Sequence, residues 1–320
     1  MPESSYSTVV FDLGAVVLGW DPVPAFATVL PAEDVPAFLD KIDFRTWNHT
    51  QDAGRTFEAG EALLVEQHGA EHTDAIQAYR LNFPKTLTGM IPGTGAVIAE
   101  LQRAGVRLLA LTNWSHETFP HARRRFGLLN RFEDILVSGA ERLAKPDPAI
   151  FRLLIERYGL DASSTVFIDD VAANIAGSEE VGLTGIQFTD SAALRARLVE
   201  LGLLGDREPV QGPVFHLTEA ATWQAAQAAG EYPWSTRDVP YDTEGYVHLS
   251  FADQVDGVRK RAYPEHADAD LVLLRLDPEP GDPIVAEDLD AGEPYPHLYA
   301  QLPLDRVRAE PLSPNVPSGH

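Results

Sequence analysis

Short apolar runs alternate along the first part of the chain with segments whose apolar residues have helical spacing. The first run, residues 8–12, is β-branched and apolar, which is typical of a strand buried on both faces of a parallel sheet. Further runs predict strands at 107–112, 135–138, 165–169 and 185–188. Helices are predicted between and after them, ending near 105, at 116–126, from 148, before 182 and at 192–201. This alternation predicts an α/β fold on a doubly wound parallel sheet.

Residues 20–90 interrupt this alternation after the first strand. Their apolar residues have helical spacing, and they contain no convincing strand pattern. We therefore expect a helical insertion that acts as a cap.

A polar segment rich in glycine and proline, residues 206–213, has the composition of a linker. It separates an expected first domain, 1–205, from a second, 214–320. Within the second domain the pattern predicts strands at 214–217, 245–249, 271–276, 297–299 and 306–310, and helices at 219–229 and from 251. Ser250 and Asp253 approach a capping box for the last helix. The pattern therefore predicts an α+β second domain.

Composition narrows the class of protein. The formal net charge of −23 argues against a nucleic-acid partner and against an anionic membrane surface, because both need clustered basic residues. The absence of cysteine excludes disulfides, thiolate nucleophiles and zinc–thiolate or iron–sulfur sites. No segment has the pattern of a signal peptide or membrane span, so a cytoplasmic location is expected. The oligomeric state is left open.

Polar residues stand at the ends of the predicted strands. Asp12 closes the first, Thr112 the second, and Asp169 with Asp170 the fourth, while Lys145 lies in the connection after 135–138. Open α/β sheets place their chemistry at the carboxyl ends of parallel strands. We expect these side chains to meet at one edge of the sheet.

These residues carry a family resemblance. The segments 9–14 (VVFDLG), 111–113 (LTN), 145–148 (KPDP) and 166–170 (VFIDD) resemble the four ordered motifs of the haloacid dehalogenase-like (HAD) hydrolase superfamily. The resemblance covers about residues 6–203. It implies a Rossmannoid parallel sheet with a helical cap insertion. The form Asp-Leu-Gly is similar to small phosphatases of sugar phosphates and to the N-terminal phosphatase domains of epoxide hydrolases.

The residue types suit metal-assisted phosphoryl transfer. A phosphate monoester dianion repels a carboxylate nucleophile, so Asp12 needs a cation close to both. Asp169 and Asp170 offer the oxygen ligands that Mg²⁺ prefers. The resemblance implies that the backbone carbonyl of Gly14 completes the protein ligands, together with Asp12.

Further residues would bind the transferred group. Thr112 and Asn113 are expected to donate hydrogen bonds to the phosphoryl oxygens, and Lys145 to neutralise the developing charge. The expected product of the first step is an aspartyl-phosphate on Asp12, which water then hydrolyses. The expected ligand is a small phosphorylated metabolite such as a sugar phosphate.

Gly14 departs from the pattern of most phosphatases in this superfamily, which carry an Asp two residues after the nucleophile as general acid and base. Such assistance typically contributes a factor of about 10²–10⁴ in rate. We therefore expect slow turnover of simple alkyl phosphates. Phosphates with good leaving groups should be less affected by the missing acid. Asp21 or His49 could supply the proton, although Asp21 before a proline more simply caps a helix.

Two alternatives stay open at this point. A metal-independent dehalogenase would use the same nucleophile on carbon, but it usually carries Ser-Ser-Asn where this chain has 169–171. Two adjacent acids without a metal would repel each other, which favours phosphoryl chemistry. A catalytically silent ligand-binding module is the other alternative, with the C-terminal domain binding a nucleotide.

Residues 213–312 resemble a bacterial family of unknown function, through the segments 214–218, 245–250 and 295–299 together with Trp223. That family is distantly similar to ADP-ribosyltransferase-type folds. His216, His248, His297 and Glu293 could converge in a cleft as proton-transfer groups or metal ligands. They could equally be partly buried side chains whose hydrogen bonds serve only to stabilise the fold.

Overall fold

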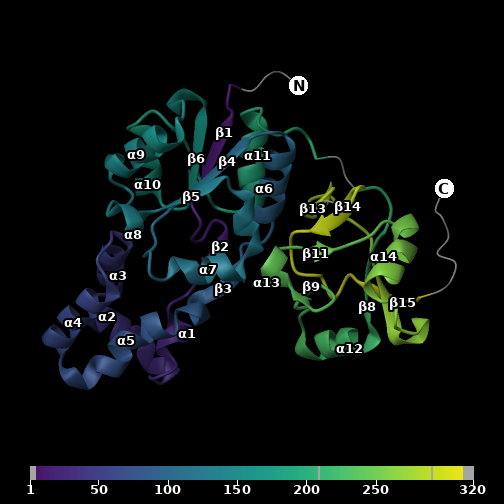
Figure 1. Cartoon of the computed structure of the whole chain (residues 1–320), viewed down its shortest axis with the longest axis horizontal. Helices are drawn as coiled ribbons and strands as arrows, with labels where there is room; N and C mark the ends of the chain where they lie inside the picture. The colour runs from purple at the N-terminus through teal and green to yellow at the C-terminus, as the bar shows by residue number, and fades with distance from the viewer. Residues whose placement is uncertain (1–4, 208–209, 290, 313–320) are drawn as a thin grey trace. The chain divides into compact units, whose positions relative to one another are not determined.

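The computed structural model describes residues 5–207, 210–289 and 291–312, so Glu208 and Pro209 of the expected linker lie outside the described residues. The chain divides into two compact units (Figure 1). The first contains the described residues up to 91, 101–125 and 129–205, and the second contains 92–100, 126–128 and the described residues from 206 onward. In the described part of the chain, none of the helices combines the length and hydropathy that a bilayer span requires.

The first unit is built on a five-stranded parallel sheet with the strand order β5-β4-β1-β6-β7. Its strands are β1 (Thr8–Phe11), β4 (Arg107–Thr112), β5 (Asp134–Val137), β6 (Thr165–Asp169) and β7 (Thr184–Gln187). The central strand β1 pairs with β4 on one side and β6 on the other, with Val10 opposite both Leu109 and Phe167. All four residues of β1 are buried, which accounts for its unbroken β-branched and apolar run.

Helices lie between and after these strands in the sequence. They are α6 (Thr94–Arg103), α7 (Phe119–Arg125), α8 (Ser138–Glu141), α9 (Pro148–Tyr158), α10 (Ala172–Glu179) and α11 (Ser191–Glu200). Ile150, Phe151 and Leu154 of α9 share one core with Val10 and Phe167 of the sheet. Their helical spacing puts all three on one face of α9.

A helical cap is inserted between β2 (Leu18–Trp20) and β3 (Leu87–Met90), which pair with each other antiparallel. It consists of α1 (Val23–Phe26), α2 (Val35–Lys41), α3 (Phe44–Asp52), α4 (Phe57–His68) and α5 (Thr73–Leu81). Tyr79 of α5 is its packing centre, with ring contacts from several helices. These contacts come from Trp20, Phe26, Phe44, Trp47, Phe57 and Phe83.

The second unit contains two three-stranded antiparallel sheets and a short β-ribbon. One sheet has the order β15 (Arg308–Pro311), β12 (Leu271–Leu276), β8 (Val214–Glu219), and the other β11 (Val247–His248), β14 (Tyr295–Leu298), β13 (Ile284–Glu287). The ribbon pairs β9 (Trp234–Thr236) with β10 (Val239–Pro240). The helices are α12 (Ala220–Ala229), α13 (Tyr241–Glu244) and α14 (Val255–Ala262).

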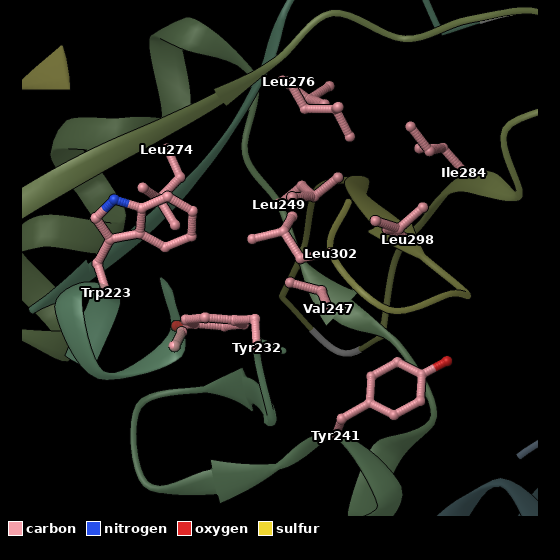
Figure 2. Packing of buried hydrophobic residues seen from close by; sticks show 12 residues of the cluster. Trp223, Tyr232, Tyr241, Val247, Leu249, Leu274, Leu276, Ile284, Leu298 and Leu302 are labelled. Carbon is pink, nitrogen blue, oxygen red and sulfur yellow. The ribbon is translucent and has the colours of Figure 1, made fainter. Parts of the chain in front are cut away.

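Strand β8 separates two apolar clusters because its side chains alternate between the faces of the sheet. Val214 belongs to a cluster with Trp223 of α12 and Leu274 of β12 (Figure 2). Phe215 and Leu217 belong to the opposite cluster, which includes Val255 of α14. His216 therefore lies on the strand face that points toward the α12 side.

The parallel sheet, the helical insertion and the second α+β unit confirm the predicted fold class. Some elements differ from the expectations. The insertion is flanked by the short strands β2 and β3. In the second unit, β9, β10 and β13 were not predicted. The capping box expected at Ser250 and Asp253 is wrong, because the backbone N–H of Phe251 instead donates to Gln254 Oε1 at 3.0 Å, just before α14.

Candidate active site

The carboxyl ends of β1, β4 and β6 bring the predicted polar residues to one edge of the sheet. Asp12 directly follows β1, Thr112 ends β4, and Asp169 ends β6. Because these strands are parallel neighbours, their ends lie side by side. Asp12, Thr112 and Asp169 are all buried.

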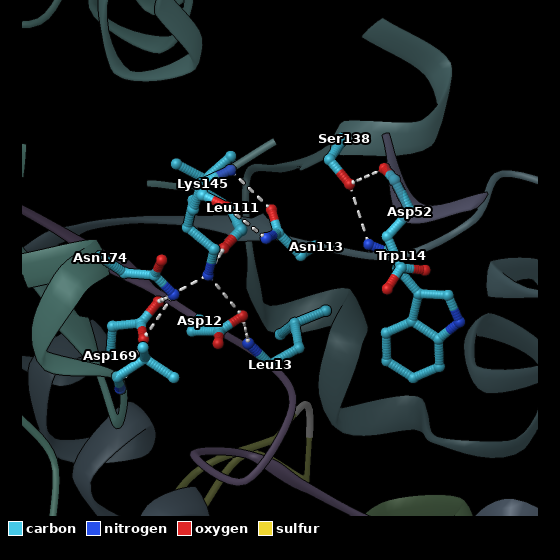
Figure 3. A network of polar contacts seen from close by, with 11 residues as sticks. Asp12, Leu13, Asp52, Leu111, Asn113, Trp114, Ser138, Lys145, Asp169 and Asn174 are labelled. Carbon is cyan, nitrogen blue, oxygen red and sulfur yellow. Dashed lines mark hydrogen bonds and ion pairs between the residues drawn. The ribbon is translucent and has the colours of Figure 1, made fainter. Parts of the chain in front are cut away.

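Lys145 joins two of the acids. Its side chain is 1% exposed, and Nζ lies 2.9 Å from Asp12 Oδ1 and 2.6 Å from Asp169 Oδ2 (Figure 3). Nζ also donates to the backbone carbonyl of Leu111 at 3.1 Å. The carboxylates raise the pKa of Lys145 above its ordinary value although burial opposes them, so the side chain is a cation.

Asn113 holds the backbone of Lys145 in place. Its Oδ1 accepts from the Lys145 N–H at 2.9 Å, and its Nδ2 donates to the Lys145 carbonyl at 2.8 Å. Asp147 then caps α9 by accepting from the Ala149 N–H at 2.8 Å. The Asn113 side chain thus holds the lysine loop, the segment 142–147 between α8 and α9. The sequence did not indicate this contact.

Asp169 is fixed by the start of α10. Asn174 Nδ2 donates to its two carboxylate oxygens at 2.9 and 3.0 Å, and the Val171 N–H donates to Oδ1 at 2.8 Å. The carboxylate is fully buried, and these hydrogen bonds hold it in one position. Asn174 is a site residue that the sequence reasoning missed.

Asp12, Asp169 and Asp170 offer ligand oxygens that all lie within 4.8 Å of one another. Three carboxylates face a single lysine, so the ionised cluster carries excess negative charge. Burial raises the pKa of Asp12 to about 7 against the opposing effect of Lys145, and burial with Asp169 raises the pKa of Asp170. A divalent cation would relieve this excess, so the donor set fits a hard metal ion.

A cavity of about 230 Å³ opens above this edge, between the sheet and the cap. Gly14, Asn113 and Asp170 line it from the sheet side. Much of the remaining wall is aromatic, contributed by Trp20, Tyr79, Phe83 and Trp114. The cavity therefore combines an acid, Asp170, on the sheet side with a wall that is largely aromatic.

Asn48 and Asp52, one turn apart on α3, also line this cavity. The Asn48 Nδ2 donates to Asp52 Oδ2 at 3.0 Å. Asp21 and His49, considered from the sequence as proton donors, are not among its lining residues. Asp21 Oδ1 accepts from the Val23 N–H at 2.9 Å, and the His49 side chain is exposed.

In the second unit, His216 is a buried side chain. Its Nδ1–H donates to the His248 carbonyl at 2.7 Å, and Nε2 lies 2.7 Å from the Tyr232 hydroxyl. Burial lowers the pKa of His216 to about 4, so the ring is neutral at physiological pH. His216 also borders a cavity of about 200 Å³.

His248 and His297 face each other in that cavity. They are register partners on β11 and β14, with ring centroids 4.9 Å apart. Glu244 Oε2 lies 2.7 Å from His248 Nε2, and Glu287 Oε1 lies 3.1 Å from His297 Nδ1. Each imidazole therefore has a carboxylate partner.

The acid expected beside these histidines was Glu293. It instead accepts from the Tyr295 hydroxyl at 2.8 Å and is not among the residues that line the cavity. Glu293 follows a turn outside the paired strands, whereas Glu287 lies within β13, which the sequence did not predict.

Known proteins resemble both parts of the chain. A family profile described as haloacid dehalogenase-like hydrolase matches residues 6–182, and one described as a protein of unknown function, DUF952, matches 217–310. The chain is similar to the sesquiterpene phosphatase AstK of Aspergillus oryzae, with 23% identity over 200 residues, covering 62% of this chain and 97% of that protein.

Two further similarities have the same extent on this chain. The acyl-CoA dehydrogenase family member 10 of Mus musculus is 26% identical over 204 residues, covering 57% of this chain but only 18% of that protein. A HAD family enzyme from Bacteroides thetaiotaomicron, solved with magnesium and inorganic phosphate, aligns at 21% identity and a TM-score of 0.46, over 58% of this chain and 95% of the other. The hydrolase profile alone spans more than half of the sequence. The chain belongs to the haloacid dehalogenase-like hydrolase family and carries a DUF952 domain in its C-terminal part.

Proposed function

We propose that the chain is a Mg²⁺-dependent phosphatase that cleaves a small phosphate monoester through an aspartyl-phosphate on Asp12. The observation that carries this proposal is the cluster of Asp12, Asp169 and Asp170 around one buried lysine. Relatives named as phosphatases support the reaction class.

The residues that would hold the ion are Asp12, Asp169, Asp170 and the backbone carbonyl of Gly14. When bound, Mg²⁺ supplies the positive charge that lets a carboxylate approach a phosphate dianion. The 2.9 Å ion pair with Lys145 favours the ionised, nucleophilic form of Asp12 and opposes the burial that raises its pKa.

A carboxylate oxygen of Asp12 attacks phosphorus, and the bond from phosphorus to the alcohol oxygen breaks. Thr112 and the backbone at Asn113 stand at the carboxyl end of β4, where they donate to the phosphoryl oxygens. Because the Asn113 side chain is engaged with Lys145, we assign it the positioning of the lysine.

The body of the cavity supports an alcohol with a substantial apolar surface. Trp20, Tyr79, Phe83 and Trp114 offer ring faces and edges to it. The similarity to a protein named sesquiterpene phosphatase points in the same direction. A sugar phosphate, expected from the Asp-Leu-Gly motif, finds fewer polar partners in this cavity, with Asn48 and Asp52 on the cap side.

The decisive experiment measures phosphate release from an aryl phosphate with and without Mg²⁺. We expect Mg²⁺-dependent release by the full chain and none by Asp12→Asn. Release of halide from a 2-haloacid without metal, and no phosphate release, would instead identify a dehalogenase. Comparing a prenyl phosphate with glucose 1-phosphate then tests whether the alcohol part of the substrate is apolar. The prenyl phosphate should have the higher kcat/KM.

The cavity of the second unit supports a second proposal, that this unit binds a small organic anion such as a nucleotide. The cavity is lined by hydrogen-bond donors, Arg261, His248 and Ser250, and by an apolar wall of Leu217, Leu249, Val258 and Leu289.

Calorimetry with NAD and with ADP-ribose tests whether the second unit binds a nucleotide. Binding should weaken in His248→Ala and persist in Lys260→Ala, a change at an exposed lysine on α14. The absence of heat with both ligands would contradict the proposal.

A further inference from the structure

The proposed reaction needs an acid that Gly14 cannot provide. The alcohol oxygen leaves as an alkoxide unless a proton reaches it, and Gly14 has no side chain at the position that usually supplies one. A substitute would have to be a protonated group in the cavity that Gly14 and Asp170 line.

We propose that Asp52 of the cap is this group: it protonates the leaving oxygen and then deprotonates the water that hydrolyses the aspartyl-phosphate. This inference rests on the proposed phosphatase function. It assigns to the cap a part of the chemistry in addition to substrate binding.

Asp52 lies on the wall of the same cavity as Gly14 and Asp170. It is the last residue of α3, and its backbone is tied to the sheet edge. Its carbonyl accepts from Ser138 Oγ at 2.5 Å, and Ser138 Oγ accepts from the Trp114 N–H at 2.9 Å (Figure 3). The carboxyl is thus carried by the cap but positioned by residues that follow β4 and β5.

Asn48 orients the carboxyl group. Its Nδ2 donates to Asp52 Oδ2 at 3.0 Å, while its buried Oδ1 finds no hydrogen-bond partner within the described residues. Because Asn48 also lines the cavity, that oxygen can accept from a bound water or from a hydroxyl of the substrate. Asn48 therefore acts as a positioning residue for Asp52.

The surroundings keep the proton on Asp52 at neutral pH. Burial raises its pKa to about 8; the backbone amide of Ser115 lowers it in part, and the negative charge of Asp12 raises it further. Asp170 adds another acid to the same cavity, and Tyr79, whose own pKa is well above the ordinary value, stays neutral. Burial also raises the pKa of Asp12, but Asp12 has the Lys145 cation 2.9 Å away and would be a ligand of the metal, and both favour its ionised form. Among the described residues Asp52 has no cation partner of this kind, so we assign the two carboxyls opposite roles.

The steps balance as follows. Asp12 forms the bond to phosphorus, the bond to the alcohol oxygen breaks, and the Asp52 proton passes to that oxygen. The Asp52 carboxylate then takes a proton from water as the water oxygen attacks phosphorus, and the bond between phosphorus and the Asp12 oxygen breaks. Inorganic phosphate leaves, Asp12 is regenerated, and Asp52 is again protonated.

Asp52→Asn tests this with two substrates, an alkyl phosphate and a nitroaryl phosphate, both measured as kcat/KM. The alkyl substrate should lose a factor of about 10²–10⁴, and the nitroaryl substrate much less because its leaving group needs no proton. For the wild type, kcat/KM of the alkyl substrate should fall as pH rises through about 8, where Asp52 loses its proton. This alkaline limb should be absent in Asp52→Asn. His49→Gln, on an exposed position of the same helix, is the matched control and should change neither substrate.

A second variant covers the case in which Asp52→Asn disturbs the cap. No heavy atom lies within 4 Å of a Cβ added at Gly14, so the backbone there has open space for the start of a side chain, and Gly14→Asp restores the usual acid. The double variant Gly14→Asp with Asp52→Asn should recover alkyl phosphate turnover. Equal losses for both substrates, no recovery in the double variant, or an unchanged alkaline limb in Asp52→Asn would each overturn the role of Asp52. A wild type that releases no phosphate from either substrate would instead refute the phosphatase itself.

Discussion

Lys145 is the only basic side chain that makes an ion pair with the acids at the sheet edge, among the residues that the structure describes. It forms ion pairs with Asp12 and Asp169 while almost completely buried, so its charge is not screened by water. Removing one partner of such a buried pair leaves uncompensated charge, which typically destabilises a protein by about 3–5 kcal/mol.

Lys145→Met keeps the length and bulk of the side chain but removes its charge. We expect Mg²⁺-dependent phosphatase activity to fall by about 10²–10³, the usual effect of losing one donor to a developing anion. The free energy of unfolding in the absence of metal should also fall, measured by urea titration. Lys41→Met, at an exposed position of the cap, is the control. A Lys145→Met variant with normal turnover would exclude the lysine from the reaction.

Sequence reasoning singled out the acids because they stand at strand ends, and the lysine because it belongs to an ordered motif in the connection after the third strand. Asp52 was not identified as the acid, because nothing local links it to Asp12, 40 residues earlier in the sequence. A signal was present in α3: Asn48 and Asp52 are four residues apart and therefore share a helix face, whereas His49 lies on another. Which face meets the cavity depends on tertiary packing, so sequence alone could not choose.

At the scale of elements, α10 determines how closely the lysine loop approaches the sheet. Gly177 lies on this helix, and an added Cβ would come within 2.2 Å of the Pro146 carbonyl oxygen. Because that atom is backbone, the contact can be relieved only by moving α10 or the loop. Asn174 of the same helix holds Asp169, so such a movement reaches two site residues.

Gly177→Ala should therefore destabilise the first unit by about 1–3 kcal/mol, although alanine favours helix formation. Activity should fall as well, since small displacements of catalytic groups reduce rates strongly. Gly257→Ala in α14 is the matched control, because its nearest neighbour is the end of the flexible Arg261 side chain at 3.2 Å. A stabilised and fully active Gly177→Ala variant would contradict the tight packing of α10.

The elements that the sequence predicted best are the buried parallel strands and the helices between them. Their boundaries follow from long apolar runs and from caps such as Asp147 before α9. The missed strands are short: β2, β3, β9, β10 and β13 have two to four residues each, and β13 directly follows Pro283. Short strands carry too little periodicity to be distinguished from loops.

At the scale of the whole molecule, the two units carry distinct clusters of ionisable groups. The acidic cluster of Asp12, Asp169 and Asp170 lies in the first unit, and the paired histidines lie in the second. Among the described residues, Asp12, Asp169 and Asp170 are the one group of three or more acidic or histidine side chains suited to holding a metal. Binding of Mg²⁺ should therefore raise the free energy of unfolding of the first unit and leave that of the second unit unchanged.

Hydrogen exchange of the full chain tests this expectation. At a Mg²⁺ concentration of 100 times its Kd, binding adds about 2.7 kcal/mol to the stability of the unit that binds it. Amides of β1 and β6 should therefore exchange more slowly with Mg²⁺, while those of β8 and β12 should not change. The difference should disappear in Asp170→Asn. Slower exchange in the second unit alone would show that the metal binds elsewhere.

The most direct test of the account is to trap the covalent intermediate. The full chain is mixed with Mg²⁺ and an aryl phosphate, quenched in acid within one turnover, and digested for mass spectrometry. The account predicts one phosphoryl group on the peptide that contains Asp12, and none in Asp12→Asn. Phosphate release without any labelled peptide, or a label on another residue, would contradict Asp12 as the nucleophile.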